Sequence, residues 1–439
     1  MKVQPRTVPV PTRDSELVER IRDDLRSMRN GPWYREGYWS ISPFNFEEGV
    51  TPGELVGKRV HLVDITGRVA EQAAGMAFSV QEKLELARAL SAAGVPEMTA
   101  AQAISKPKMQ RHVEAIRAAN LPIKISALAY SEDDLRAAAH AGAQIIEIVI
   151  LARPSIDAAY NGTHIRTEDE LLQRADRLIT LAKSLGLEAR SGINDVGYSR
   201  PGYVERYVRA AVSAGADAIQ LADSSASLGP RALAHLVRQV KHAAPNVSVG
   251  VHLHNDFGLA SACGVAALEA GADSFDVSVN GIGDKAGQLD LASFAIAIEA
   301  IYRVETGLKF ERLNDLSRLV QDLTRTRVPP TFPISGDRTF QAVMKNTAMA
   351  EHYIDPSFLM PIFPQRVGNR SSLGLGRHSG DFGILRKADE LGFTVTEDQL
   401  PVLLEDLDCW FEVHKRLIAD DEVITLLSKN GCRRSTESS

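Results

Sequence analysis

Short apolar runs alternate with longer segments of helical periodicity from about residue 59 onward. Runs such as 143–151 are apolar at consecutive positions, as expected for strands buried on both faces. Segments such as 168–185 repeat apolar residues at intervals of three and four, which predicts helices with one buried face. Several of these helical segments end in a glycine that suits a C-cap, namely Gly94, Gly142, Gly186, Gly215 and Gly271.

The number of repeats indicates which α/β fold the chain adopts. The expected strands are 59–66, a short one near Glu97, 122–129, 143–151, 187–192, 216–222, 247–254 and 274–279. The expected helices are 80–93, 132–141, 168–185, 202–214, 230–244, 259–270 and 289–302. Eight strand–helix units in roughly 240 residues are typical of a TIM (β/α)8 barrel in the α/β class. A doubly wound open sheet shares the alternation, but no glycine-rich phosphate fingerprint follows the first strand.

The regions on either side of the repeats have a different pattern. Before them, a charged helix at 15–28 precedes a cluster of aromatic residues, which we expect to pack on the protein or to cover a partner subunit. After them, we expect helices at 310–323, 384–391, 396–408 and 413–429, with an irregular stretch at 347–366. The predicted organisation is an N-terminal extension (1–58), the barrel (59–305), a helical C-terminal linker subdomain (306–432) and a frayed tail (433–439).

Composition narrows the class of protein. The chain has 439 residues, of which 44% are hydrophobic, and a formal net charge of −6. No basic stripe indicates nucleic-acid binding, and no apolar run approaches the roughly 18 residues of a membrane span. The N-terminus has no apolar leader segment, and Cys263, Cys409 and Cys432 are too far apart for a CxxC site. These features predict a globular protein of the reducing cytoplasm.

Two histidines provide the strongest chemical signal. His252 and His254 are two residues apart at the carboxyl end of an expected strand, so their imidazoles project from the same face. Such a pair forms half of a divalent-metal site. The structural alternative is a pair of hydrogen-bonded core histidines.

Other polar residues occupy the same position in the repeats. In a TIM barrel the working groups lie at the carboxyl ends of the strands and in the loops that follow. The residues at such positions are Asp64, Arg68, Glu71, Gln72, Glu97, Glu147, Arg153, Asn194, Asp195, Asp223, Ser224, Ser225, Asn255, Asp256 and the loop 280–288. For any one of them a loop-capping role is the alternative, and Asp223 and Asp256 suit helix caps equally well.

Four motifs resemble one known family. They are the His-x-His-Asn-Asp-Phe-Gly-Leu-Ala run at 252–260, the Asn-Gly-Ile-Gly-Asp-Lys-Ala-Gly loop at 280–287, Asp-Ser-Ser-Ala-Ser-Leu-Gly-Pro at 223–230, and Leu-Gly-Leu-Gly-Arg-His-Ser-Gly at 373–380. Over about residues 40–430 the chain resembles the DRE-TIM metallolyase superfamily. The branch is that of 2-isopropylmalate, homocitrate and Re-type citrate synthases, which carry a pyruvate carboxyltransferase domain.

The resemblance implies an acyltransferase that condenses acetyl-CoA with a 2-oxo acid to give a 2-hydroxy diacid. A divalent metal ion (Mg, Mn or Zn) would hold the 2-oxo acid, and the chain would form a homodimer. By the same resemblance the metal ligands are His252, His254 and Gln288. The catalytic residues are Arg68, Glu97 and His378, and the substrate-binding residues are Asp64, Gln72, Ser224 and Asn255. Arg153 is a further substrate-binding candidate because its charge suits an acidic group of the substrate, and a surface role is the alternative.

The metal motif departs from the family pattern. Val69 stands where the family has a ligating aspartate, and valine cannot coordinate a metal ion. Gln288 replaces the family's asparagine ligand, and Asn194 replaces a glutamate. The histidine usually found in the linker is missing between 340 and 345, so His378 or His352 would have to stand in for it.

Three functions therefore stay open. The first is the acetyl-CoA-dependent synthase. The second is a carbon–carbon lyase or aldolase on the same barrel, but related lyases need a cysteine in the loop 280–288, which has none. The third is a catalytically altered or inactive paralogue that binds a ligand or a partner, for which Val69 is the evidence. The sequence does not indicate which 2-oxo acid is used.

Overall fold

The chain forms two compact units. The structure is a computed structural model that describes residues 6–355 and 360–435. One unit comprises Glu47–Pro329 with Pro333–Ser335, and the other comprises Met1–Phe46, Pro330–Phe332 and Gly336–Ser439. Each unit has its own apolar core, so each is described by itself.

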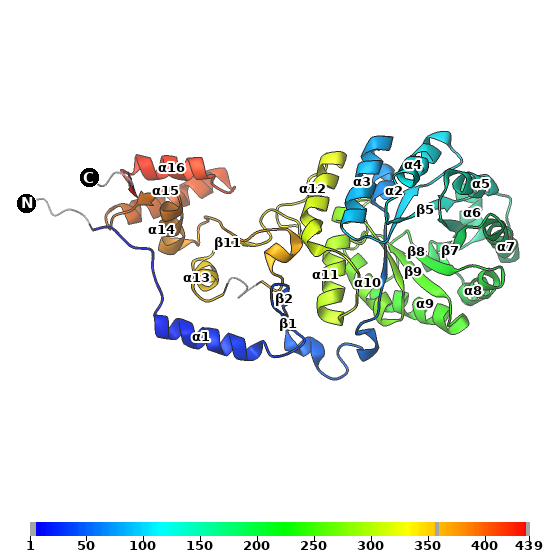
Figure 1. Ribbon diagram of the computed structural model, residues 1–439, viewed down its shortest axis with the longest axis horizontal. Coiled ribbons are helices and arrows are strands. Elements are labelled where there is room, and N and C mark those ends of the chain that lie inside the picture. The colour runs from blue at the N-terminus through cyan, green and yellow to red at the C-terminus, as the bar shows by residue number, and fades with distance from the viewer. Residues whose placement is uncertain (1–5, 356–359, 436–439) are drawn as a thin grey trace, which may run out of the picture. The chain divides into compact units, whose positions relative to one another are not determined.

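The larger unit is a closed barrel of eight parallel strands in the order β10-β3-β4-β5-β6-β7-β8-β9 (Figure 1). The strands are β3 (His61–Asp64), β4 (Glu97–Ala101), β5 (Lys124–Ala129), β6 (Ile145–Leu151), β7 (Glu188–Asn194), β8 (Ala218–Asp223), β9 (Ser248–Leu253) and β10 (Ser274–Val277). β10 pairs with β3 in parallel, with Ser274 opposite His61, and this pairing closes the barrel. The predicted (β/α)8 fold is confirmed.

Helices surround the strands, as the labelled elements of Figure 1 show. They are α3 (Val80–Ala92), α4 (Pro107–Ala118), α5 (Glu132–Ala141), α7 (Glu168–Ser184), α8 (Tyr203–Ser213), α9 (Pro230–Ala243), α10 (Ala260–Glu269) and α11 (Leu291–Tyr302). The sequence pattern did not predict α4, because this helix is rich in charged residues. Its fully buried side chains are His112, Val113 and Ile116, so the apolar period is weak.

Two further short helices follow barrel strands and were also not predicted. They are α2 (Thr66–Val69) after β3 and α6 (Pro154–Asn161) after β6. Neither is long enough to show an apolar period. Both lie at the carboxyl ends of the strands, and both contribute side chains to the cavity described below.

The alternation of side chains along a strand explains how β6 can line a cavity and also pack against the helices. On β6, Glu147, Val149 and Leu151 line a cavity inside the barrel. The intervening Ile148 and Ile150 are fully buried. Because side chains on a strand alternate between its two faces, one sequence run serves both the cavity and the helix layer.

The barrel unit continues past the predicted boundary at residue 305. The short helix η6 (Phe310–Arg312) and the helix α12 (Leu313–Thr324) belong to it. α12 buries Leu313, Leu316 and Val320, and it contacts α3. The apolar face of α12 packs on the barrel unit, so this unit extends to Pro329.

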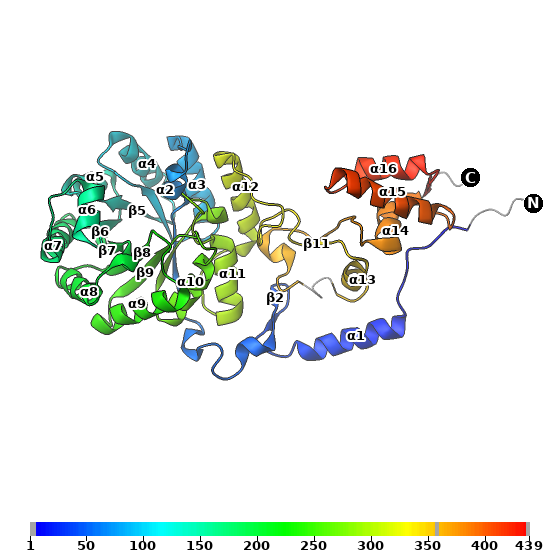
Figure 2. The same ribbon diagram turned by 180° about the vertical axis from the view of Figure 1, so that it is seen from behind.

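The second unit is built mainly from four C-terminal helices: α13 (Lys345–Tyr353), α14 (Gly380–Glu390), α15 (Gln399–His414) and α16 (Asp420–Lys429). Figure 2 shows α14, α15 and α16 together, and they share a core that includes Leu385, Leu403 and Leu427. Two pairs of short strands complete it: β11 (Gln341–Ala342) with β12 (Ser372–Leu373), and β13 (Phe393–Thr394) with β14 (Arg433–Arg434).

Three predictions for this unit were wrong. The stretch expected to be irregular at 347–366 begins with α13, which buries Ala348, Met349 and Ala350. The helix expected at 413–429 begins only at Asp420, because Lys415 adopts the left-handed conformation and ends α15. The tail expected from residue 433 begins with β14, which pairs with β13; residues 436–439 lie outside the described residues.

The N-terminal extension joins the C-terminal helices. Its helix α1 (Ser15–Met28) was predicted with these bounds. Arg22 in α1 donates a 2.8 Å hydrogen bond to the carbonyl oxygen of Tyr353. In the strand pair β1 (Tyr34–Arg35) and β2 (Trp39–Ser40), Trp39 is buried and forms a bridge with Ile362. This contact agrees with the expectation that the aromatic segment packs on the protein.

The helices of the described ranges, 6–355 and 360–435, include none that is both long and apolar enough to cross a membrane.

Candidate active site

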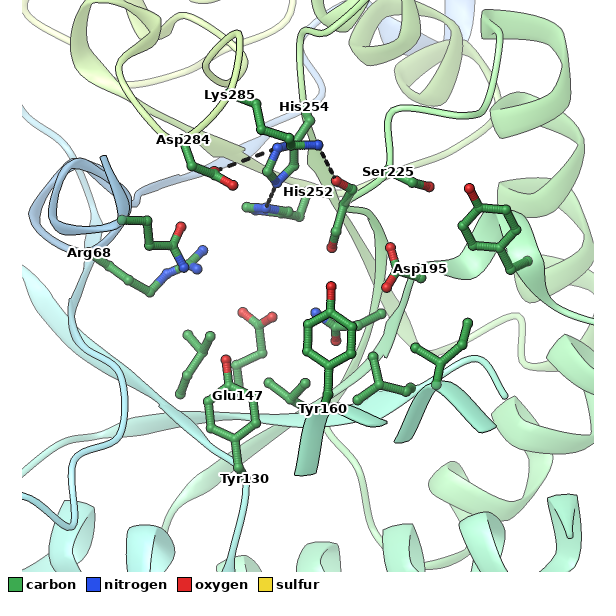
Figure 3. A pocket seen from close by; sticks show the side chains of 18 residues that line it. Arg68, Tyr130, Glu147, Tyr160, Asp195, Ser225, His252, His254, Asp284 and Lys285 are labelled. Atoms are coloured by element: carbon green, nitrogen blue, oxygen red, sulfur yellow. Dashed lines mark hydrogen bonds and ion pairs between the residues drawn. The ribbon is translucent and has the colours of Figure 1, made fainter. Parts of the chain in front are cut away.

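A cavity of about 560 Å³ opens where the barrel strands end. Its lining comes from the carboxyl ends of β5, β6, β7 and β9 and from the loops that follow the strands (Figure 3). The lining residues are Arg68, Gln72, Leu128, Tyr130, Glu147, Val149, Leu151, Ile156, Tyr160, Asn194, Asp195, Tyr198, Ser224, Ser225, His252, His254, Asp284 and Lys285. This is the end of a TIM barrel at which working groups are expected.

The two histidines converge at one side of this cavity. Nε2 of His252 lies 3.3 Å from Nε2 of His254. Nδ1 of His252 lies 2.9 Å from a carboxylate oxygen of Asp276 on β10. Nδ1–H of His252 donates this hydrogen bond to the aspartate, so Nε2 of His252 carries a lone pair that faces Nε2 of His254. Metal-binding histidines are held in the same way.

Both imidazoles are neutral at ordinary pH. Burial lowers the pKa of His252 to about 4, and the positive charge of Arg68 adds to this effect. Burial likewise holds the pKa of His254 well below its usual range, with His252 as the next cause. A histidine must be unprotonated to coordinate a metal ion, so the environment keeps this pair ready for that role.

Gln288 supplies a third donor next to the histidines. Its Nε2 lies 3.3 Å from Nε2 of His254, and its Oε1 is buried without a hydrogen-bond partner among the described residues. A half-turn of the amide would direct this oxygen toward the imidazoles. The donor set is therefore two neutral nitrogens and one amide oxygen, which suits a cation that accepts nitrogen ligands, such as Zn²⁺.

None of the three donors carries the negative charge that a harder cation requires, and the carboxylate beside them, that of Asp284, accepts a 3.2 Å hydrogen bond from Nε2 of Gln288. Val69 is fully buried in a small apolar cluster with Val63 and Ile65. Within the described ranges, no group of three or more His, Cys, Asp or Glu residues is arranged to hold a metal ion. The residues therefore do not fit Mg²⁺ or Mn²⁺, which depend on oxygen ligands with negative charge.

Arg68 supplies a fixed positive charge opposite the acidic side of the cavity. It lies in α2, is 5% exposed, and its Nε has no hydrogen-bond partner among the described residues. Figure 3 shows its side chain extended into the cavity. A buried guanidinium with a free N–H is suited to a carboxylate or to an oxygen that gains negative charge.

Two carboxyl groups line the cavity with altered acidity. Figure 3 shows Glu147 between Tyr130 and Tyr160, on the side of the cavity that faces the histidines. Burial raises the pKa of Glu147, and the nearby Asp276 raises it further. Burial also raises the pKa of Asp195, which follows β7. A carboxylate with a raised pKa is a stronger base than an exposed one.

Glu97 lies away from the cavity, in contrast to its predicted catalytic role. It is the first residue of β4, at the amino end of the barrel, and it does not line the cavity. Its carboxylate accepts two hydrogen bonds from Arg190, at 3.0 and 2.9 Å, and lies 2.8 Å from Nε2 of His61. Burial alone would raise the pKa of Glu97, but Arg190 and His61 outweigh it and hold the pKa at about 2.

Of the predicted substrate-binding residues, Gln72 and Ser224 line the cavity. The structure gives local partners to the others, which do not line it. Both oxygens of Asp64 accept hydrogen bonds from Thr66, and burial raises the pKa of Asp64 to about 7. The side-chain oxygen of Asn255 accepts a hydrogen bond from the backbone of Ala260.

Two further predicted residues also lie outside the cavity lining. The side chain of Arg153 donates to the carbonyl oxygen of Tyr198 and is not among the lining residues. His378 is exposed and belongs to the other compact unit. The catalytic role of His378 stays a prediction.

Known proteins match this chain over most of its length. Residues 59–320 match the HMGL-like family. A protein of Methanopyrus kandleri named "Probable 2-isopropylmalate synthase" is 34% identical over 78% of this chain and 68% of the relative.

The chain belongs to the HMGL-like family.

Two further relatives with other names match this HMGL-like chain. The (R)-citramalate synthase of Methanocaldococcus jannaschii is 30% identical over 84% of this chain and 74% of the relative. The homocitrate synthase of Methanothermobacter thermautotrophicus is also 30% identical, over 84% of this chain and 92% of the relative. The three names share the word synthase and differ in the product.

Solved structures of HMG-CoA lyases share the barrel of this HMGL-like chain. That of Brucella melitensis has a TM-score of 0.55 and 24% identity, and the match covers 61% of this chain and all of the lyase. That of Pseudomonas aeruginosa has a TM-score of 0.55 and 21% identity, over 62% of this chain and 95% of the lyase. At this level of identity the likeness concerns the fold alone.

Several residues of the site went unrecognised in the sequence. Tyr130 and Tyr160 line the cavity, and Asp276 orients His252, yet none belongs to a motif. A signal existed for Tyr130, because it is two residues after Leu128 and shares its face of the chain. For Tyr160 and Asp276 the sequence shows no such signal.

Proposed function

We propose that this chain is an acyl-CoA-dependent synthase that condenses acetyl-CoA with a 2-oxo acid. Water then hydrolyses the thioester, so that a 2-hydroxy diacid and free CoA are released. The observation that carries the proposal is the 34% identity to a relative named as a 2-isopropylmalate synthase, over 78% of this chain. The cavity at the carboxyl end of the barrel supports it, because Arg68 and the histidine pair line one space.

Arg68 would bind the negative oxygens of the reaction. The 2-oxo acid brings a carboxylate, and its carbonyl oxygen gains negative charge when the new carbon–carbon bond forms. The free Nε–H of Arg68 is buried, so its interaction with either oxygen is weakly screened. Gln72 and Ser224 are neutral hydrogen-bonding groups in the same lining.

His252, His254 and Gln288 would hold the divalent cation, and Asp276 would orient His252. When bound there, a divalent cation supplies Lewis acidity to the carbonyl of the 2-oxo acid. We propose Zn²⁺ in preference to Mg²⁺ or Mn²⁺, because the three donors are neutral and two of them are nitrogens.

A carboxylate in the lining would take the proton from the acetyl methyl group. Glu147 and Asp195 are the candidates, because burial raises the pKa of each. Each can be replaced by its amide with little change of shape. The two variants are Glu147→Gln and Asp195→Asn. We expect the variant that removes the base to lose turnover and the other variant to retain it.

Release of free thiol from acetyl-CoA tests the synthase directly. The wild-type protein is assayed with acetyl-CoA and a panel of 2-oxo acids, with Zn²⁺, Mn²⁺ or Mg²⁺ added, and the product is identified by mass. We expect thiol release that requires both substrates and yields their condensation product. Silence across the panel from folded protein would overturn the proposal and favour a repurposed barrel, for which Val69 is the specific observation.

Metal content tests the cation site without relying on activity. We expect about one zinc ion per chain in the wild type and none in His252→Ala. The variant Val69→Asp restores the missing carboxylate, so it should gain affinity for Mn²⁺ in titration calorimetry. If the wild type binds no divalent ion, the cation has no part in the function of this chain.

The homodimer implied by the resemblance is part of the same proposal. Mass measurement in solution would test it, and a mass near one chain at assay concentration would contradict it.

A further inference from the structure

One side of the cavity is an apolar wall that consists of Leu128, Tyr130, Val149, Leu151 and Ile156. These five residues form a single cluster, and all of them line the cavity. Three of them are aliphatic strand residues that are at most 3% exposed. They alternate along β5 and β6 with residues that face the helices, so their inward direction is fixed by the strands themselves.

The apolar wall contains no cationic residue that could pair with a carboxylate on the side chain of the substrate. Among the lining residues the cationic side chains are Arg68, already placed at the reacting carboxylate, and Lys285. Lys285 lies 3.1 Å from a carboxylate oxygen of Asp256 and donates a 2.7 Å hydrogen bond to the carbonyl oxygen of Ser224. A second carboxylate on the substrate would therefore lose its water at the apolar wall without gaining a counter-charge.

A buried ion pair lies directly behind the apolar wall. Nη1 of Arg174, on α7, lies 2.5 Å from a carboxylate oxygen of Asp157, on α6. Asp157 is fully buried, and it also accepts hydrogen bonds from Asn161 at 2.9 Å and Thr163 at 2.7 Å. Neither Asp157 nor Arg174 lines the cavity, so the pair can act on a substrate only through its neighbours.

The same guanidinium joins the two elements that carry the apolar wall. Nη2 of Arg174 donates a 2.6 Å hydrogen bond to the carbonyl oxygen of Tyr130, at the end of β5. Nη1 holds α6, which carries Ile156 and Tyr160 to the cavity. Because a guanidinium is planar and rigid, the two bonds fix the distance between the end of β5 and α6.

We propose that Asp157 and Arg174 form a positioning pair, which sets the distance between the end of β5 and α6 and so the spacing of the residues of the apolar wall. The apolar wall in turn selects 2-oxo acids with a bulky alkyl or aryl side chain. This inference rests on the proposed synthase function and names its substrate class. A bulky apolar group gains most from a wall held at a fixed distance, whereas a methyl group touches little of it.

The test compares kcat/KM for four 2-oxo acids whose side chains are methyl, isobutyl, benzyl and a chain that ends in a second carboxylate. We expect the wild type to prefer the isobutyl or benzyl acid at least tenfold over both the methyl and the carboxylate acids. In Arg174→Met we expect the ratio of bulky to methyl acid to fall at least tenfold. Loss of stability alone would lower all four values together.

Two further variants keep the test decisive. Lys183→Met is the matched control, because it removes another ion pair of α7, the exposed one with Asp217 at 2.7 Å. We expect it to leave the ratio within twofold of the wild type. Ile156→Ala shortens the apolar wall without touching the ion pair, so it should lower the ratio even if Arg174→Met fails to fold.

The outcomes separate this inference from the proposed function. If the wild type acts on no 2-oxo acid, the synthase function is overturned. If the wild type is active but prefers the methyl or the carboxylate acid, the apolar wall does not select the substrate. If the ratio is unchanged in folded Arg174→Met, the positioning role is wrong.

Discussion

Two clusters of charged and polar residues lie inside the same barrel, and they differ in how well their members are paired. At the amino end, the carboxylate of Glu97 has Nε2 of His61 and Nη2 of Arg190 within 3.0 Å, and only Nη1 of Arg190 lacks a hydrogen-bond partner among the described residues of this cluster. At the mouth of the barrel, which is the cavity at the carboxyl ends of the strands, the Nε of Arg68 and the Oε1 of Gln288 are buried without hydrogen-bond partners among the described residues. Paired buried charges hold a structure together, whereas unpaired donors and acceptors are free to bind a ligand.

The two clusters also respond to burial in different ways. Burial works to raise the pKa of Glu97, but the charge of Arg190 and the hydrogen bond with His61 hold the pKa at about 2. At the mouth burial dominates, and it lowers the pKa of His252 to about 4. The amino-end cluster is thus kept ionised, while the histidines of the mouth are kept neutral.

The largest expected effect comes from breaking the amino-end cluster. Glu97→Gln leaves the buried Arg190 without its carboxylate, so we expect the free energy of unfolding to fall by about 3–5 kcal/mol in urea titrations. Glu147→Gln is the control, because Arg190 is 4.0 Å from Glu147, and it should cost less than about 1 kcal/mol. If Glu97→Gln is as stable as the wild type yet inactive, Glu97 is catalytic after all.

The next effect separates activity from stability at the mouth. Arg68→Met removes a buried charge whose Nε has no hydrogen-bond partner among the described residues, so we expect kcat/KM to fall about 10²–10³-fold. The free energy of unfolding should change by less than about 1 kcal/mol. Arg68→Lys keeps the charge but loses the planar guanidinium group, so its kcat/KM should lie between those of the wild type and Arg68→Met. Undiminished turnover in Arg68→Met would contradict the role given to this residue.

The smallest effect is a dependence of stability on pH. The unfolded chain protonates His252 near its ordinary pKa of 6.5, whereas the folded chain does so only near pH 4. Its contribution is therefore complete above pH 6.5 and is lost as the pH falls toward 4. With a chelator present, the difference in unfolding free energy between wild type and His252→Gln should shrink by about 2 kcal/mol from pH 7.5 to 4.5. A constant difference would mean that His252 protonates alike in both states.

Glu97 illustrates where prediction from the sequence failed. The sequence predicts a short strand near Glu97 but does not show whether this residue begins or ends the strand. The predicted catalytic role requires Glu97 at the carboxyl end. In the structure Glu97 begins β4, and the strand continues to Ala101. One strand length separates a catalytic position from a structural one, and strand ends are the least certain part of such a prediction.

The long elements were predictable because their periods are strong. α5 and α1 have the predicted bounds, and β6 and α7 differ by one or two residues at an end. The histidine pair was predictable as well, because a strand places alternate residues on one face wherever it lies. Short helices such as α2 and α6 were not, because four to eight residues cannot display a helical period.

The sequence by itself determined that eight strands alternate with at least seven helices, that His252 and His254 share a face, and that Val69 stands where the family has a carboxylate. These properties follow from local periodicity and from residue identity. Only the tertiary structure decided that Asp276 orients His252, that Glu97 pairs with Arg190, and that Arg174 joins Tyr130 to α6. These contacts join residues 17 to 93 positions apart, and barrel closure brings such residues together without leaving a pattern in the chain.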